Sequence, residues 1–341
     1  MRNKIIRRGI LFFFVIFFVY AALLLNYSCS RIDTRNVNVV VDIPTGASFW
    51  KSMKILDQAG LIKNRFFFYN LAVIQRARLK IRAGEYEFST LITPWEMMKK
   101  LKRGDVKVYK ITVREDLSLR EIAEILDKEK LINKEIFFEM ASDKEFLESL
   151  NIKADSIEGY LFPDTYYFNR SMNTHQIMKT MVDTFRKKVT PEMILEANKR
   201  GLSEHQFVTF ASMIGKESGN NEEKPKISAV FHNRLKKRMP LQSDPTAVYD
   251  LDDFAGKVLR SHLKRKSPYN TYLIQGLPPG PIANPGLDSL RAVLKPATVD
   301  YLYFVSKNDG THNFSSSLAE HHQAVKQYFD LKNQQIQPLE K

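Results

Sequence analysis

The pattern of hydrophobic and polar positions begins with an uncharged apolar run from Ile10 to Leu25, which basic residues precede. A helix of roughly 17–25 residues crosses a bilayer, so we expect a cytoplasmic tail over residues 1–8 and a transmembrane anchor over residues 9–28. The basic tail should remain in the cytoplasm. The chain would then cross the cytoplasmic (inner) membrane once and lie on its outer, periplasmic side. A cleaved signal peptide is the alternative, with Ser28 and Ser30 as the small residues before the cut.

An internal repeat follows. The stretch IPTGASFWKSMKILDQAGLIKNRFFF from Ile43 aligns without gaps with VREDLSLREIAEILDKEKLINKEIFF from Val113. In both copies apolar positions recur three and four residues apart, which predicts amphipathic helices, and a strand-like run precedes each copy. We therefore predict two modules of strand, helix, turn and second helix, over residues 37–105 and 106–172. Residues 83–88 should close the first module with another strand.

Each module resembles the small LysM-like modules that bind glycan. A duplicated structural module without a ligand is the alternative, and the repeat pattern alone does not choose between them.

From about Thr174 the pattern becomes helical, and we place a catalytic domain over residues 173–335. Near the carboxyl end, YLYFV from Tyr301, a turn at 308–310 and a strand through Phe314 predict a hairpin before a closing helix. The expected fold is α+β: a transmembrane helix, LysM-like strand–helix–helix modules, and a helix-rich catalytic domain with a short β hairpin.

One predicted helix of this domain ends in a glutamate. It begins at Ser203, with Gln206 three residues later as a capping box, and its apolar stripe runs through Phe210 and Ile214 to Glu217. Desolvation and the negative end of a helix dipole both oppose ionisation. A carboxyl that stays protonated near neutral pH can act as a general acid. An ordinary glutamate at a fraying helix end is the bland alternative.

Two polar segments follow that helix. PLQSDPT contains Gln242, Ser243 and Asp244, and Asp-Pro marks a turn. The proline-rich stretch SPYNTYLIQGLPPGPIANPG, from Ser267 to Gly286, contains Tyr269, Asn270 and Tyr272. Tyrosine faces stack on sugar rings, and amides bind hydroxyl and acetamido groups. Both segments are candidate substrate contacts, and a rigid surface loop is the alternative for the second.

Composition narrows the classes of function. The 341 residues carry a net charge of +14, which suits nucleic acid, anionic lipid or an acidic polymer. An export signal argues against nucleic acid. Cys29 is the only cysteine, which excludes an internal disulfide and any cysteine-rich metal cluster. The histidines form no H-E-x-x-H pattern, so we expect neither a metal nor another cofactor.

The motifs together resemble one family. IEGYLFPDTY, ASMIGKES, FHNRL, LQSDPT, SPYNTY, GLPPGPIANPG, YLYFV and GTHNFSSSLAEH occur in the order seen in endolytic murein transglycosylases, the YceG-like family. The resemblance runs from the anchor to the last helix and maps the family's catalytic glutamate to Glu217. Gly215, before the Lys-Glu pair, and Ser243, where threonine is usual, depart from the commoner pattern.

The resemblance implies cleavage of the MurNAc–GlcNAc bond in nascent peptidoglycan strands, which yields 1,6-anhydro-MurNAc ends and terminates elongation. It also suggests proximity to wall-synthesis enzymes. Two alternatives stay open: a hydrolytic muramidase that uses Glu217 with Asp244, and a non-catalytic scaffold whose repeats bind the wall.

Overall fold

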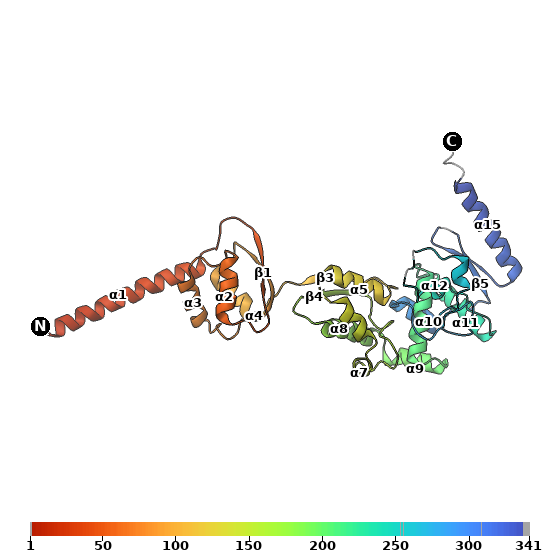
Figure 1. The fold of residues 1–341 in the computed structure, drawn as a ribbon, viewed down its shortest axis with the longest axis horizontal. Helices are drawn as coiled ribbons and strands as arrows, with labels where there is room; N and C mark the ends of the chain where they lie inside the picture. The colour runs from red at the N-terminus through yellow and green to blue at the C-terminus, as the bar shows by residue number, and fades with distance from the viewer. Residues whose placement is uncertain (1, 253, 255, 308, 337–341) are drawn as a thin grey trace. The chain divides into compact units, whose positions relative to one another are not determined.

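The computed structural model describes residues 2–252, 254, 256–307 and 309–336 (Figure 1). The chain forms two compact units. One contains Met1–Tyr109 with Tyr167–Met172, and the other contains Lys110–Tyr166 with Asn173–Lys341. In the described part the strands form three two-stranded sheets, β1–β2, β3–β4 and β5–β6. The fold is α+β, as predicted.

The first unit carries the apolar helix and the first repeat. Its elements are α1 (Arg2–Cys29), β1 (Asn38–Ile43), α2 (Phe49–Gln58), α3 (Arg65–Ile74), β2 (Gly84–Ser89) and α4 (Pro94–Arg103). β1 and β2 pair antiparallel from Asn38 opposite Ser89 to Ile43 opposite Gly84, so the predicted closing strand is confirmed. The alternating inward residues of β2 and the apolar faces of the helices form one core.

Helix α1 is long and apolar enough over Ile5–Cys29 to cross a membrane. Its first half is exposed, whereas its second half packs on the first unit through one face of the helix. The rings of Tyr20 and Tyr27 contact Phe67 of α3, with centroids 6.2 and 5.6 Å apart, and Leu24 between them is buried. Figure 1 shows α3 beside the carboxyl end of α1.

The second unit begins with the second repeat. Its elements are β3 (Tyr109–Thr112), α5 (Leu119–Lys128), α6 (Lys134–Ala141), α7 (Lys144–Ser149) and β4 (Thr165–Phe168). The chain passes from one unit to the other within β3 and β4. Ser118 caps α5 in a capping box with Glu121, as Ser48 caps α2 in the first copy. Both copies therefore show the predicted order of strand, helix and helix.

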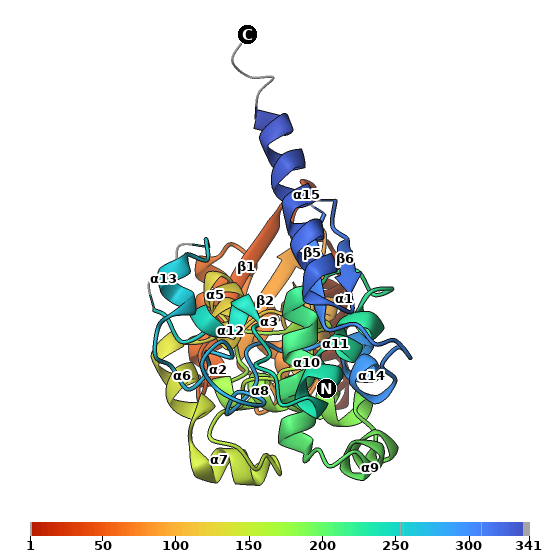
Figure 2. The same ribbon diagram turned by 90° about the vertical axis from the view of Figure 1, so that its right-hand side faces the viewer.

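The rest of the second unit is mostly helical (Figure 2). It contains α8 (Thr174–Lys188), α9 (Pro191–Lys199), α10 (Glu204–Glu217), α11 (Lys224–Lys236), α12 (Asp244–Val248), α13 (Arg260–Leu263), α14 (Leu287–Leu294), β5 (Tyr303–Ser306), β6 (His312–Ser315) and α15 (Leu318–Ile336). Helix α10 packs against α9, α11, α12 and α14, and Phe207, Phe210 and Ile214 of its stripe are fully buried. This surrounded helix holds Glu217 in place.

Two local predictions differ from the structure. Asp244-Pro245 begins the short helix α12 instead of forming a simple turn, because proline fits the first helical position. The hairpin forms as expected, but its first strand starts at Tyr303 and not at Tyr301. Asn308 of the predicted turn lies outside the described residues.

Candidate active site

The last residue of α10 is Glu217, and the local sequence explains its position. The Ser203 side chain accepts a hydrogen bond from the Gln206 backbone N–H, and Gln206 returns one to the Ser203 N–H, so the predicted capping box is present. From that start the apolar stripe is buried up to Ile214. Ser218 adopts an extended conformation and ends the helix. Glu217 is consequently half-buried at the edge of the core.

The Ser243 hydroxyl donates a short hydrogen bond to Oε1 of Glu217. Ser243 itself is only 1% exposed. Burial raises the pKa of Glu217 to about 7, and the nearby Asp244 carboxylate raises it further, whereas the Ser243 hydrogen bond and the Arg234 charge oppose the increase. A carboxyl with this pKa is protonated in a large fraction of molecules at neutral pH and can also accept a proton.

Hydrogen bonds join the two polar segments that the sequence singles out. The Tyr272 hydroxyl donates to Oδ1 of Asp244 at 2.5 Å. The backbone N–H of Ser243 donates to the Thr271 hydroxyl at 2.9 Å, and that of Gln242 donates to the Thr271 carbonyl at 3.1 Å. The proline-rich segment therefore lies directly beside the loop that contacts Glu217.

Asn270 occupies a supporting position. It is 0% exposed, and its amide nitrogen donates to the carbonyls of Leu263 and Arg265 at 3.2 and 2.8 Å. Its side-chain oxygen accepts from the backbone N–H of Tyr272. Because the loop itself uses these groups, the side chain shapes the segment and offers nothing to a sugar hydroxyl in this conformation.

Arg234 is a residue that sequence reasoning missed. It is buried, and its guanidinium donates to the carbonyls of Leu302 and Leu241 at 2.6 and 2.8 Å and to the side-chain oxygen of Gln242 at 3.1 Å. Gln242 is exposed and has a left-handed φ of 54°. Arg234 therefore holds a strained turn next to Ser243. Its place in the FHNRL motif was the available signal.

The unusual Gly215 also has a structural reason. A Cβ built there would lie 1.7 Å from Oδ1 of Asp116, so the Asp116 carboxylate occupies the space of the absent side chain. Burial raises the pKa of Asp116 to about 6, while Lys224 favours its charged form. The Lys216 ammonium donates to the Asp116 carbonyl at 3.2 Å. The segment before α5 thus packs directly on the last turn of α10.

Glu158 is a second buried carboxyl that the sequence did not single out. It accepts hydrogen bonds from the Leu119 backbone N–H at 2.9 Å, the Asn284 amide at 2.7 Å and the Tyr249 hydroxyl at 3.0 Å. Burial raises its pKa to about 7, although these donors favour the carboxylate. Asn284 also accepts from the backbone N–H of Gly159 at 3.0 Å. This cluster ties α5 and the proline-rich segment together beneath the site.

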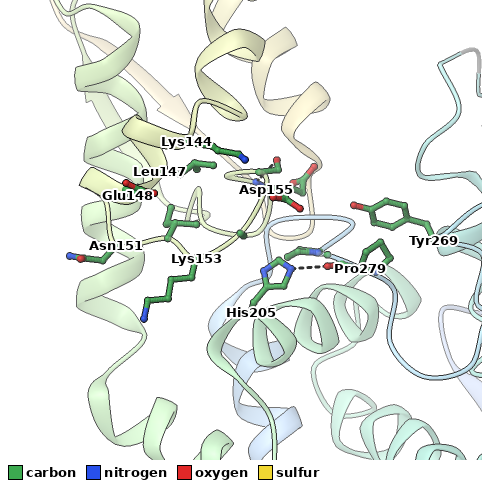
Figure 3. A pocket seen from close by; sticks show the side chains of 15 residues that line it. Lys144, Leu147, Glu148, Asn151, Lys153, Asp155, His205, Tyr269 and Pro279 are labelled. Carbon is green, nitrogen blue, oxygen red and sulfur yellow. Dashed lines mark hydrogen bonds between the residues drawn. The ribbon is translucent and has the colours of Figure 1, made fainter.

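Two cavities flank this cluster. One, of about 710 Å³, is lined by Lys216, Asp244 and Pro245 on the Glu217 side and by Arg120, Phe138 and Tyr249 opposite. The other, of about 590 Å³, is lined by Tyr269, His205, Pro279 and charged side chains such as Lys153 and Asp155 (Figure 3). Glu158 borders both. The Tyr249 and Tyr269 rings, 4.7 Å apart between centroids, contact each other between the cavities.

Two other residues of the motifs have structural contacts. His312 Nδ1 lies 2.8 Å from Oε2 of Glu223, and Glu320 accepts the backbone N–H groups of Ser316 and Ser317 at the start of α15. Within the described part of the chain, no three or more His, Cys, Asp or Glu side chains are grouped to hold a metal ion.

The structure therefore brings most of the predicted site residues together. Ser243 contacts Glu217 directly, Asp244 and Tyr272 lie next to that pair, and Gln242 adjoins it in the chain. Tyr269 faces the other cavity.

Comparison with known proteins gives a consistent set of relatives. A model of the YceG-like family matches residues 41–327. The chain is 36% identical over 315 residues to a Bacillus subtilis protein named endolytic murein transglycosylase, covering 87% of this chain and 86% of that protein. A Streptococcus pneumoniae protein of the same name is 27% identical over 326 residues, and the match spans 59% of its length.

A solved structure is also similar. The crystal structure of a YceG-like protein from Listeria monocytogenes superposes with a TM-score of 0.59 and 33% identity. The match covers 84% of this chain and 98% of that one.

Proposed function

This chain belongs to the YceG-like family, and on that premise we propose that it is an endolytic murein transglycosylase with Glu217 as its catalytic acid and base. The observation that carries the assignment is the half-buried Glu217, whose pKa is raised to about 7 beside a cavity and the proline-rich segment. The substrate is the glycan strand of peptidoglycan.

In the proposed reaction Glu217 acts twice. Protonated Glu217 donates its proton to the glycosidic oxygen as the MurNAc–GlcNAc bond breaks. The resulting carboxylate then removes the proton from the muramoyl C6 hydroxyl, whose oxygen bonds to the anomeric carbon. The new chain end is a 1,6-anhydro-MurNAc, no water is consumed, and Glu217 regains its proton. A pKa near 7 suits both steps, since neither protonation state is strongly disfavoured at neutral pH.

The neighbouring residues would set the state and position of that carboxyl. Ser243 holds Oε1 by its hydrogen bond, while the negative charge of Asp244 disfavours ionisation of Glu217. Tyr272, hydrogen-bonded to Asp244, and the exposed Gln242 offer an aromatic face and an amide to sugar groups. Tyr269 would contact the strand on the side of the other cavity.

Product analysis tests the proposal. Uncrosslinked glycan strands are digested with the full-length protein and the fragments are weighed by mass spectrometry. We expect anhydro ends from the wild type and at least a thousandfold loss of rate for Glu217→Gln. Fragments heavier by one water would indicate a muramidase that uses Glu217 with Asp244. If the wild type were as inert as the variant, the chain would be a scaffold.

The anchoring helix and the modules complete the proposal. We propose that α1 stays attached and spans the inner membrane, with both compact units on the periplasmic side, where nascent strands and wall-synthesis enzymes lie. The two strand–helix–helix copies would be LysM-like modules preceding the catalytic domain. Binding of purified, uncleaved glycan strands to the Glu217→Gln protein would test the modules, and absence of retention would leave them a structural role.

A further inference from the structure

The packing of α1 on the first unit has a consequence for depth in the bilayer. Tyr20 lies within the apolar stretch Ile5–Cys29, and its ring contacts both Phe66 and Phe67 of α3 at centroid distances of 6.2 Å. Leu24 and Ser28, on the same face of α1, are buried against the unit. A folded part of the chain therefore covers a helix at a level where a membrane-spanning helix would be surrounded by lipid.

The helix rise gives the depth. With Arg8 at the inner boundary, Tyr20 lies about 18 Å along the axis at about 1.5 Å per residue. Because the hydrocarbon core is about 30 Å thick, Tyr20 is still about 12 Å inside the outer boundary. A tilt of about 20° would place it deeper still.

The surface of the first unit suits such a position. Phe66 is 63% exposed, and Ile74, on the same face of α3, is also exposed. Leu79, in the loop after α3, is 98% exposed and lies among the basic residues Arg76, Arg78, Lys80 and Arg82. Exposed apolar side chains flanked by basic ones are typical of segments that bind the interface of a bilayer with anionic lipid.

The start of α4 marks the level of the headgroups. Backbone hydrogen bonds from Ile32 to Ile92 and from Asp33 to Thr90, at 3.1 and 2.8 Å, hold this region beside the residues that follow α1. Trp95, in the first turn of α4, is exposed, and tryptophan favours the membrane–water interface. The Lys63 ammonium reaches the carbonyl of Arg31 at 3.1 Å, so its charge also lies toward that level.

We propose that the first compact unit is partly immersed in the outer leaflet of the membrane, with Phe66 of α3 in the hydrocarbon and Trp95 of α4 among the headgroups. The partner is the lipid bilayer itself. This inference rests on the proposed role of α1 as an uncleaved anchor, and it is independent of the chemistry assigned to Glu217. It means that the first module is held against the bilayer instead of swinging freely above it.

Depth-dependent fluorescence quenching tests this. In a Cys29→Ser background, Phe66→Cys and Val40→Cys are each labelled with an environment-sensitive fluorophore, and the full-length protein is placed in phosphatidylcholine–phosphatidylglycerol vesicles that contain acyl-brominated lipid. Val40 is the matched control because it is an exposed apolar residue of the same unit, 44% accessible, on β1. We expect the label at position 66 to be quenched at least threefold more than the label at position 40.

A second reporter needs no change at α3. Trp50→Phe leaves Trp95 as the single tryptophan of the chain, and its emission should be quenched best by lipid brominated near the headgroup. Ile74→Cys provides another site if Phe66→Cys disturbs the contact with α1. Equal quenching at positions 66, 74 and 40 in protein that floats with the vesicles would overturn the immersion and leave the anchor intact. Loss of flotation, or an amino terminus cleaved after α1, would overturn both, whereas the product analysis judges the enzyme assignment separately.

Discussion

Ser243 donates its hydroxyl hydrogen to Oε1 of Glu217, so the residue before the Asp-Pro pair directly contacts the carboxyl that ends α10. The two residues come from different segments of the second unit, and their contact stabilises the charged form of Glu217 against burial. The acidity of the proposed catalytic group is therefore set by opposing neighbours, and each can be changed separately.

Removing the hydroxyl should make Glu217 a weaker acid. Ser243→Ala deletes the hydrogen bond that lowers the pKa of Glu217, so the pKa should rise above about 7 and the alkaline limb of kcat/KM should move up by about 0.5–1 pH unit. Initial rates between about pH 5 and 9 measure this. Ser243→Thr retains a hydroxyl and serves as the control. An unchanged limb in the alanine variant would contradict the assigned contact.

Removing the neighbouring charge should act in the opposite direction. Asp244→Asn takes away a negative charge that raises the pKa of Glu217 but retains an acceptor for Tyr272. We expect the alkaline limb to move to lower pH, anhydro ends to remain the product, and the rate to fall much less than in Glu217→Gln. Complete loss of cleavage, with hydrated ends in the wild type, would instead support a second catalytic carboxylate.

The raised pKa also predicts how stability depends on pH. The folded protein holds a proton on Glu217 up to about pH 7, above the ordinary value of 4.5, so this group's stabilising contribution is complete below the ordinary pKa and is lost as pH rises through the folded pKa. Glu217→Gln, which never ionises, should be more stable than the wild type at pH 8 by about 1–3 kcal/mol.

Urea unfolding at about pH 5 and 8 measures that difference, which should shrink toward the lower pH. The exposed Glu222→Gln is a control for loss of a surface carboxyl. A gap between Glu217→Gln and the wild type that stays constant with pH would mean that Glu217 titrates normally in the folded protein.

The fit of Asp116 against Gly215 predicts a steric effect. Gly215→Ala should cost about 2–3 kcal/mol of stability and lower kcat, because the new methyl group needs the space of the Asp116 carboxylate. Asp116 has a left-handed φ of 64°, which glycine adopts readily. Adding Asp116→Gly should therefore recover part of the loss, as thermal unfolding and rate measurements would reveal. Strictly additive effects would contradict direct contact.

Local features of the fold were predictable from sequence because their causes are local. The Ser203–Gln206 capping box and the stripe through Phe210 and Ile214 define α10 within a few turns of chain. The strand–helix–helix order of the repeats follows from short periodic patterns in the same way. Asn270 shows the limit of this reasoning: its type suggests sugar binding, but only the folded loop reveals that its amide is already used.

The sequence by itself determined where the helices and strands lie, which carboxyl ends a buried helix, and that an apolar segment precedes two repeated modules. Tertiary structure alone decided that Ser243 holds Glu217, that Asp116 fills the space at Gly215 and that α3 covers Tyr20. Each of these contacts joins residues far apart in the chain, and their approach depends on how whole elements pack. Periodicity reports only which face of an element is buried, and not which distant side chain meets it.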